Sequence, residues 1–327
     1  MKPINLFYEE PDPDRWIKFD RYPRKIIRSI VRGKTRPGGV MTIAINLIKG
    51  LEKLGIPYRF NNYSYIKKHP KEVACIIGKP NVLFDKHWDN PILFGAGIFS
   101  HPVDCPDLFK EYPNVKKILV PGNWMKQMFE PYYGDKVAIW PTGIDTDYWK
   151  PDEQSKKTDF LIYDKPLWGA EKSPKYILNT VTNSLQAKGL TYSYIKYGNY
   201  NPTQLINELR NAKGCIFLSR HETQGLAYQQ ILSTNTPVLA FDPGGYWPDT
   251  SYYPHKVQFQ PVSSVPYWDE RCGKKFMGAV DFDQALEKFL SNLSHFKPRD
   301  FVIENLSLEV CANKYLDILK DVESQLN

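Results

Sequence analysis

The chain has 327 residues, of which 42% are apolar and 24% charged, and its formal net charge is +7. This length predicts two domains rather than one, and the ordinary composition excludes a fibrous or disordered chain. No apolar run of about 18 residues occurs, which excludes a membrane-spanning helix. The amino-terminal residues also lack the apolar run of a secretion signal, so we expect a cytoplasmic protein.

Five cysteines stand singly, at Cys75, Cys105, Cys215, Cys272 and Cys311. Their odd number and the lack of a Cys-x-x-Cys pair predict reduced thiols. The basic run at 20–36 suits contact with phosphate, anionic membrane lipid or nucleic acid, and equally the solvated face of a helix. The solvated helix is the favoured interpretation for most of these charges.

Short apolar segments alternate with helical patterns along the first half of the chain. Strands are predicted at 4–7, 58–60, 73–77, 92–95, 117–120 and 137–140. A helix is predicted at 40–55, where Ile43, Leu47 and Leu51 repeat with a helical period, and another at 123–130. This alternation is typical of an α/β fold with parallel sheets.

The polar segment 150–157 is interpreted as a linker, after which the alternation starts again. Strands are predicted at 160–163, 191–196, 215–218 and 237–241, and helices at 174–188, 202–211, 226–233, 283–290 and 308–326. We therefore expect domains at 1–150 and 151–327, with a last helix that can pack back on the first domain.

The segment from Ser219 to Gly245 is the most informative part of the sequence. A strand ends at Leu218, a polar loop with Glu222 follows, and Gly225 lets the backbone turn into a helix that starts near Leu226. The N–H groups of a helix amino terminus suit a phosphate or a sugar oxygen. A carboxylate there can accept hydrogen bonds from sugar hydroxyls or cap the helix, and the residues alone favour neither role.

This segment resembles the signature of retaining family-4 glycosyltransferases of the GT-B type. Glu222-Thr-Gln-Gly225-Leu226 aligns with their Glu-x-Phe-Gly-Leu, with Gln224 at the place of Phe, and Pro237-Val-Leu-Ala240 and Gly244-Gly245 follow in order. The resemblance implies that Glu222, Gln224 and the amides near Gly225 and Leu226 hold the donor sugar and its phosphate. The second carboxylate of the family falls on Gln230, which would contact the donor ribose as a neutral group.

Further segments resemble family motifs in the right order. They are Arg36-Pro-Gly38-Gly39-Val40, the segments 120–129 and 137–151, and the helix at 305–316. The resemblance thus covers about residues 36–322. It implies two Rossmann-like domains facing across a cleft, with donor contacts at Gly38, Gly39 and Gly143.

In this family an Arg/Lys pair after the first strand of the second domain binds the donor diphosphate. Lys165 and Lys172 stand at those places, with Lys175 as a rival for the second. His101 matches a histidine near the reacting sugar, although a lone histidine is often structural. Tyr197 is expected near the nucleotide base.

No metal and no cofactor are expected. Asp145-Thr-Asp147 resembles a metal-binding Asp-x-Asp, but it lies inside a motif that the family uses as a linker. His101 and Cys105 lack the further ligands that zinc requires.

The sequence therefore predicts a metal-independent, retaining glycosyltransferase of the hexosyltransferase type. Its expected partners are a nucleoside-diphosphate sugar, a saccharide, lipid-linked or other hydroxyl acceptor, and an anionic membrane touched from the periphery. Nucleic acid is not an expected partner, because no recognised module accompanies the basic run. Three alternatives stay open. They are another GT-B enzyme, such as a sugar-nucleotide epimerase or a glycogen-type phosphorylase, a degenerate sugar-nucleotide-binding protein, which Gln230 favours, and a nucleic-acid-binding protein, to which the basic run points.

Overall fold

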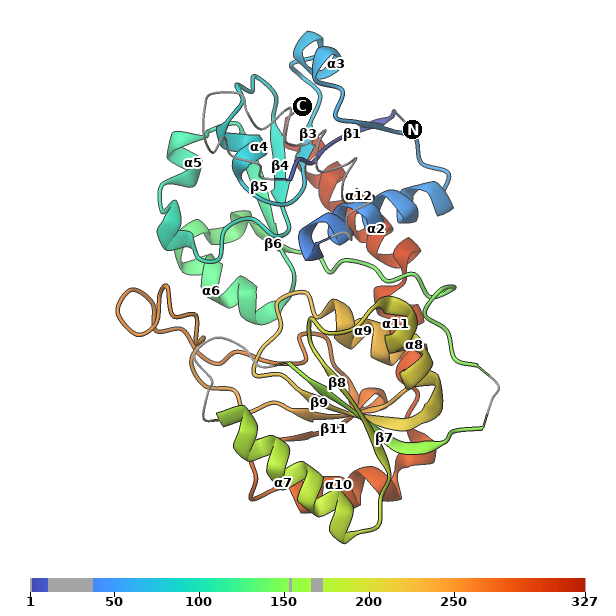
Figure 1. The fold of residues 1–327 in the computed structure, drawn as a ribbon. Coiled ribbons are helices and arrows are strands. Elements are labelled where there is room, and N and C mark those ends of the chain that lie inside the picture. The colour runs from blue at the N-terminus through green and yellow to red at the C-terminus, as the bar shows by residue number, and fades with distance from the viewer. Residues whose placement is uncertain (1, 11–37, 153–154, 166–172, 327) are drawn as a thin grey trace, which may run out of the picture. The chain divides into compact units, whose positions relative to one another are not determined.

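The computed structural model of the chain describes residues 2–10, 38–152, 155–165 and 173–326 (Figure 1). These residues form two compact units. The first comprises Met1–Val120, Phe129–Trp140 and Ala312–Asn327, and the second comprises Pro121–Met128 and Pro141–Cys311. Each unit is built on one parallel sheet with helices packed against it.

The first unit has a six-stranded sheet in the order β2-β1-β3-β4-β5-β6, with every neighbouring pair parallel. Its strands are β1 Ile4–Phe7, β2 Tyr58–Phe60, β3 Ala74–Ile76, β4 Ile92–Gly95, β5 Val115–Val120 and β6 Val137–Ile139. Its helices are α2 Gly39–Lys53, α3 Tyr63–Lys68, α4 Asn81–Phe84, α5 Leu108–Glu111, the end of α6 Asn123–Tyr133, and α12 Leu308–Ser324 from Ala312 onward.

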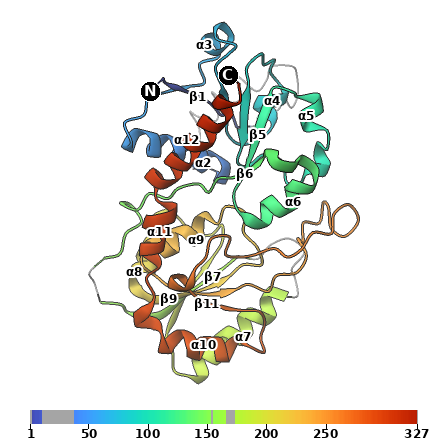
Figure 2. The same cartoon turned by 180° about the vertical axis from the view of Figure 1, so that it is seen from behind.

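One face of this first sheet packs against α2 and α12, which lie side by side in both views (Figure 2). The helical repeat of Ile43, Leu47 and Leu51 turns these side chains of α2 toward the sheet, where they are buried. Trp140 and Tyr315 meet edge to face with ring centroids 5.0 Å apart, and both are fully buried. The last helix of the chain therefore supplies part of the core of the first unit.

The second unit has a five-stranded parallel sheet in the order β11-β10-β9-β7-β8. Its strands are β7 Thr158–Asp164, β8 Tyr192–Lys196, β9 Ala212–Leu218, β10 Val238–Phe241 and β11 Gly273–Phe276. Its helices are α7 Ser173–Ala187, α8 Pro202–Asn211, α9 Leu226–Ser233, α10 Phe282–Ser291 and α11 Pro298–Leu306.

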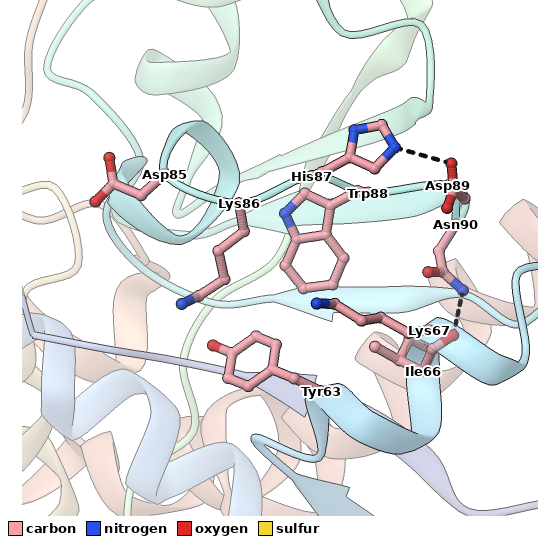
Figure 3. A pocket seen from close by; sticks show the side chains of 9 residues that line it. All are labelled: Tyr63, Ile66, Lys67, Asp85, Lys86, His87, Trp88, Asp89 and Asn90. Carbon is pink, nitrogen blue, oxygen red and sulfur yellow. Dashed lines mark hydrogen bonds and ion pairs between the residues drawn. The ribbon is translucent and has the colours of Figure 1, made fainter.

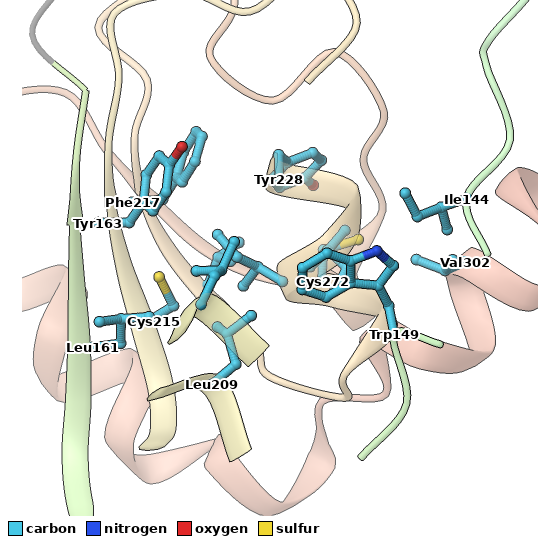
Figure 4. Close-up of a cluster of buried hydrophobic side chains, with 14 of the residues drawn as sticks. Ile144, Trp149, Leu161, Tyr163, Leu209, Cys215, Phe217, Tyr228, Cys272 and Val302 are labelled. Carbon is cyan, nitrogen blue, oxygen red and sulfur yellow. The ribbon is translucent and has the colours of Figure 1, made fainter. Parts of the chain in front are cut away.

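Both faces of this second sheet are covered. Alternate residues such as Leu161, Tyr163 and Phe217 pack toward α8, α9 and α11 (Figure 4), while Phe160 and Ile216 pack toward α7 and α10. Strands buried on both faces explain the nearly continuous apolar runs of the sequence.

The two parallel sheets confirm the predicted fold class of two Rossmann-like α/β halves. Every strand and helix predicted within the described residues occurs, with its ends shifted by up to three residues, while the helix favoured for the basic run at 20–36 lies outside the described residues. Among the described residues, the α-helices and strands that the sequence did not indicate are α3, α4, α5, α11 and β11. Three of these helices have only four to six residues, too few for a helical period, and β11 is the polar segment Gly-Lys-Lys-Phe.

The five cysteines are buried and free, as their single spacing predicted. In the described ranges, no helix combines the length and the apolar character that crossing a membrane requires.

Candidate active site

The turn that connects β9 to α9 places a carboxylate at the carboxyl ends of the strands of the second sheet. β9 ends at Leu218 and α9 begins at Leu226. Gly225 precedes the helix in the left-handed conformation, with φ 58° and ψ 41°, which a residue with a Cβ atom seldom adopts. A Cβ atom there would also lie 3.2 Å from Cγ of Pro266. The glycine therefore shapes the turn that carries Glu222.

Lys165 meets Glu222 at these strand ends. Lys165 directly follows β7, and β7 pairs in parallel with β9, so the carboxyl ends of both strands lie together. The Lys165 Nζ atom lies 2.7 Å from each carboxylate oxygen of Glu222, and the Ser219 hydroxyl donates to Oε1 at 3.0 Å. The two charged side chains are 15% and 7% exposed. The structure therefore joins two predicted site residues in one shielded ion pair.

Two further contacts hold the backbone of Glu222. Its N–H donates to the Ser263 carbonyl at 2.9 Å, and its carbonyl accepts from the Trp124 indole N–H at 2.9 Å. Asp242 fixes Ser263 in turn, because it accepts from the Ser263 hydroxyl at 3.0 Å and from the Ser264 N–H at 2.8 Å. The direction of the Glu222 side chain is thus set by residues that the sequence analysis did not single out.

His221, next to Glu222, is also buried. Burial, followed by the charges of Lys165 and Arg220, lowers the pKa of His221 to about 4. This imidazole is therefore neutral near pH 7, and the only positive side chain paired with Glu222 among the described residues is Lys165. Its adjacency to Glu222 in the sequence is the one signal that could have drawn attention to His221.

Gln224 links the turn to the segment before the second sheet. Its Oε1 atom accepts from the Thr142 N–H and from the Tyr267 hydroxyl, both at 3.2 Å. Its Nε2 atom is buried and has no hydrogen-bond partner among the described residues. Gln224 therefore holds the turn in place through its Oε1 atom, while its Nε2 amide group stays unpaired among the described residues.

Tyr197 lies beside the ion pair. Its N–H donates to the Asp164 carbonyl at 2.8 Å, and its half-exposed ring has its centroid 4.7 Å from the Lys165 Nζ atom. Gln230 lies one turn along α9 from Leu226 and is partly exposed. The structure thus gathers Lys165, Tyr197 and the turn from Glu222 to Leu226 at the carboxyl ends of the strands of the second sheet.

Gly143 has a packing role that accounts for its lack of a side chain. A Cβ atom there would lie 2.8 Å from the Ser307 carbonyl oxygen and 2.8 Å from the Leu308 Cα atom. Asp145, in the rejected Asp-x-Asp motif, accepts from the Tyr148 N–H at 3.1 Å and so closes a turn.

Three predicted residues belong to the first unit. Gly38 is the N-cap of α2 in an extended conformation, and its carbonyl accepts from the Thr42 N–H at 2.9 Å. No described atom lies within 4 Å of a Cβ atom built on Gly39, so packing within the described residues does not require a glycine there. His101 is buried after β4, and its Nδ1 atom accepts from the Val103 N–H at 3.0 Å.

Burial lowers the pKa of His101 below its ordinary value, so the ring is neutral near pH 7. Since Nδ1 accepts a hydrogen bond, the proton of the neutral ring lies on Nε2. Lys172, the side chain of Lys175 and the basic run at 20–36 lie outside the described residues.

Comparison with known proteins gives matches at the level of structure. No protein-family model matches the sequence, and no curated protein matches it. A sucrose-phosphate synthase from Thermosynechococcus elongatus superposes with a TM-score of 0.52 at 11% identity, over 99% of this chain and 100% of that one. The lipopolysaccharide outer core galactosyltransferase WaaB, in its apo form, gives 0.51 at 12% identity, over 98% and 99%.

A variant of TarM from S. aureus, in complex with fondaparinux, alpha-GlcNAc-glycerol and UDP, gives a TM-score of 0.53 at 13% identity. The match covers 78% of this chain, which spans only 57% of the TarM chain. These structures are GT-B glycosyltransferases, and the chain has the GT-B fold.

Proposed function

We propose that the chain, on the premise of its GT-B fold, is a metal-independent and retaining glycosyltransferase. It would move a hexosyl group from a nucleoside-diphosphate sugar to a saccharide, lipid-linked or other hydroxyl acceptor. The observation that carries this proposal is the Lys165–Glu222 pair beside the amino terminus of α9. The TarM structure, which holds UDP and alpha-GlcNAc-glycerol, supports a nucleotide donor and a carbohydrate acceptor.

Each member of the ion pair can exchange its partner for part of a donor. A diphosphate offers Lys165 anionic oxygens like those of the Glu222 carboxylate. Sugar hydroxyls can donate to the Glu222 oxygens that Lys165 then leaves. Because both side chains are shielded from water, their charges act strongly on a ligand at these strand ends. Donor binding would replace one internal ion pair with two sets of charge-assisted hydrogen bonds.

The departing diphosphate needs stabilisation of its charge. Lys165, Lys172 and the N–H groups in the first turn of α9 would supply it, since these N–H groups have no partner within the helix. Each charge-assisted hydrogen bond contributes about 1.5–3 kcal/mol. In this proposal the cations belong to the chain itself, and no metal ion takes part.

The transfer step exchanges one bond at the anomeric carbon for another on the same face of the sugar. The bond from the anomeric carbon to the diphosphate breaks, and the acceptor oxygen forms the new bond. The acceptor proton passes to the departing phosphate. His101, which carries its proton on Nε2, is proposed to donate to the reacting sugar, and Gly38 and Gly39 to let the donor approach the backbone.

Two residues are proposed to hold the nucleoside. The half-exposed ring of Tyr197 offers an aromatic face beside Lys165 for the base. Gln230 would bind the ribose hydroxyls through its neutral amide, which both donates and accepts. Gly143 and Gln224 would shape the donor side of the turn.

A thermal-shift screen against a panel of nucleoside-diphosphate sugars tests the proposal, because a ligand that binds only the native state raises Tm. We expect one donor to raise Tm, and radiolabelled transfer or hydrolysis of that donor to follow. Glu222→Ala and Lys172→Ala should each abolish the Tm shift and most of the turnover. The control Glu270→Ala changes an exposed carboxylate of the same unit and should alter neither.

Two outcomes would contradict the proposal. If no nucleotide sugar shifts Tm, the donor site is wrong. If a donor binds but is neither hydrolysed nor transferred, the chain is a sugar-nucleotide-binding protein instead of an enzyme.

A further inference from the structure

A cavity of about 660 Å³ lies in the first unit, between α3 and the segment 85–90 that leads into β4 (Figure 3). Tyr63, Ile66 and Lys67 of α3 line one wall, and residues 85–90 line the other. The volume falls within the range of about 300–1,000 Å³ that small-molecule sites occupy. None of these residues belongs to the proposed donor site.

The base of the cavity is aromatic and firmly supported. Tyr63 and Trp88 both pack on Phe7, each with ring centroids 5.0 Å from the Phe7 ring. The Trp88 indole N–H donates to the Val82 carbonyl at 3.1 Å, so the ring is held in place as an apolar wall. An aromatic wall of this kind suits the apolar face of a sugar ring.

Asn90 ties the two walls of the cavity together. Its Nδ2 atom donates to the carbonyls of His69 and Glu72, at 2.8 and 3.0 Å, which lie just beyond the end of α3. Asn90 is 2% exposed, so these hydrogen bonds are shielded from water. The spacing between α3 and the segment 85–90 is therefore set before any ligand enters.

Two ammonium groups reach from opposite walls toward the space between the rings of Tyr63 and Trp88 (Figure 3). The Lys86 Nζ atom lies 4.6 Å from the centroid of the Tyr63 ring and 3.3 Å from a carboxylate oxygen of Glu9. That pair is about one-third exposed at each end, and Glu9 also accepts from the Tyr63 hydroxyl at 2.7 Å. An ion pair exposed to this degree contributes little free energy, so an anionic ligand can replace Glu9 at Lys86 at low cost. Lys67 makes no ion pair with any residue that the structure describes.

We propose that this cavity binds a phosphate-bearing sugar, with the sugar ring against Tyr63 and Trp88 and the phosphate between Lys67 and Lys86. Two lysines offer six N–H donors and no acceptor, which suits a dianionic phosphate. The carboxylates of Asp85 and Asp89, which also line the cavity, can accept from sugar hydroxyls and repel a long polyanion such as nucleic acid, although Oδ1 of Asp89 already lies 3.0 Å from Nε2 of His87. The cavity and the proposed donor site share no residue.

Calorimetric titration of the full chain with α-glucose 1-phosphate at low ionic strength tests this site, with glucose and inorganic phosphate as partial ligands. The sugar phosphate should bind at least about tenfold more tightly than either part. Lys67→Gln should weaken its binding about tenfold, because one charge-assisted hydrogen bond is lost. Lys68→Gln is the matched control, since Lys68 is the next residue on α3 and does not line the cavity.

Glu222→Ala should leave this titration unchanged, which separates the cavity from the donor site. Equal binding by the wild-type chain and Lys67→Gln would overturn the proposal. Equal affinity for inorganic phosphate would overturn the role of the aromatic wall, and equal affinity for glucose would overturn the role of the two lysines.

Discussion

Replacing Lys165 with methionine removes the positive member of the buried pair while keeping much of its volume. Among the described residues, the Glu222 carboxylate then keeps only the Ser219 hydroxyl as a charge-stabilising side-chain contact. Breaking a buried ion pair from one side costs about 3–5 kcal/mol. Because the Lys165 side chain is 15% exposed, we expect the lower end, a loss of about 3 kcal/mol in the free energy of unfolding.

The companion change Glu222→Gln leaves Lys165 without its anion and should cost about 2 kcal/mol. In the double variant neither of the two positions leaves a charge buried without its partner, so the summed losses should not appear in full. We expect a coupling free energy of about 2 kcal/mol between the two positions. A saturating nucleotide-sugar donor should reduce this coupling, because Lys165 then contacts the diphosphate.

Urea unfolding of the four proteins in the cycle measures this coupling from the midpoints at a constant m-value. Lys196→Met is the matched control, because Lys196 is an exposed residue at the end of the neighbouring strand β8. It should change stability by no more than about 0.5 kcal/mol. If the two single losses simply add, Lys165 and Glu222 do not support each other and the exchange of partners during donor binding is refuted.

Three further changes test the surroundings of the pair. The pKa of His221 is lowered to about 4 in the folded chain, so below about pH 6.5 the unfolded chain protonates this imidazole and the folded chain does not. The free energy of unfolding should therefore fall by about 2 kcal/mol from pH 7.5 to pH 5. Urea midpoints should show this loss in the control His255→Gln and not in His221→Gln. Gly225→Ala should lower the free energy of unfolding by about 1–2 kcal/mol and abolish the Tm shift that the donor causes. Its control is Gly189→Ala, because Gly189 is also left-handed, at φ 66°, and this change should cost as much stability and keep the Tm shift. Trp124→Phe removes the indole N–H that donates to the Glu222 carbonyl, so it should lower the free energy of unfolding by about 1 kcal/mol and raise KM for the nucleotide sugar. An unchanged KM would show that this hydrogen bond does not position Glu222.

The turn at the candidate site could be predicted because its signals are local. Gly225 marks the one residue that needs a left-handed backbone, and the apolar run of β9 and the start of α9 bracket it within a few residues. The same local alternation was enough to indicate both sheets and their parallel connections. These features depend on neighbours in the chain, which a single sequence contains.

The partner of Glu222 could not be predicted in this way. Lys165 lies 57 positions away in the sequence, and the two meet only because β7 inserts between β8 and β9 in the sheet. The order of strands in a sheet follows from packing and leaves no trace in residue spacing. The anchoring of Glu222 through Ser263 and Asp242 was missed for the same reason.

The docking of the last helix has a consequence for how the chain folds during synthesis. Tyr315, Leu316, Leu319 and Val322 fill the core beneath the first sheet, although all six strands of that sheet are translated before residue 140. The second unit ends at Cys311, and the last strand of its sheet, β11, ends at Phe276. All of its sheet is therefore translated before the chain reaches Cys311. On the ribosome, the half that is made first must therefore wait with an open apolar face, while the half that is made second can close without it. A stop codon shortly after residue 311 should consequently spare the later half and leave the earlier one prone to aggregation.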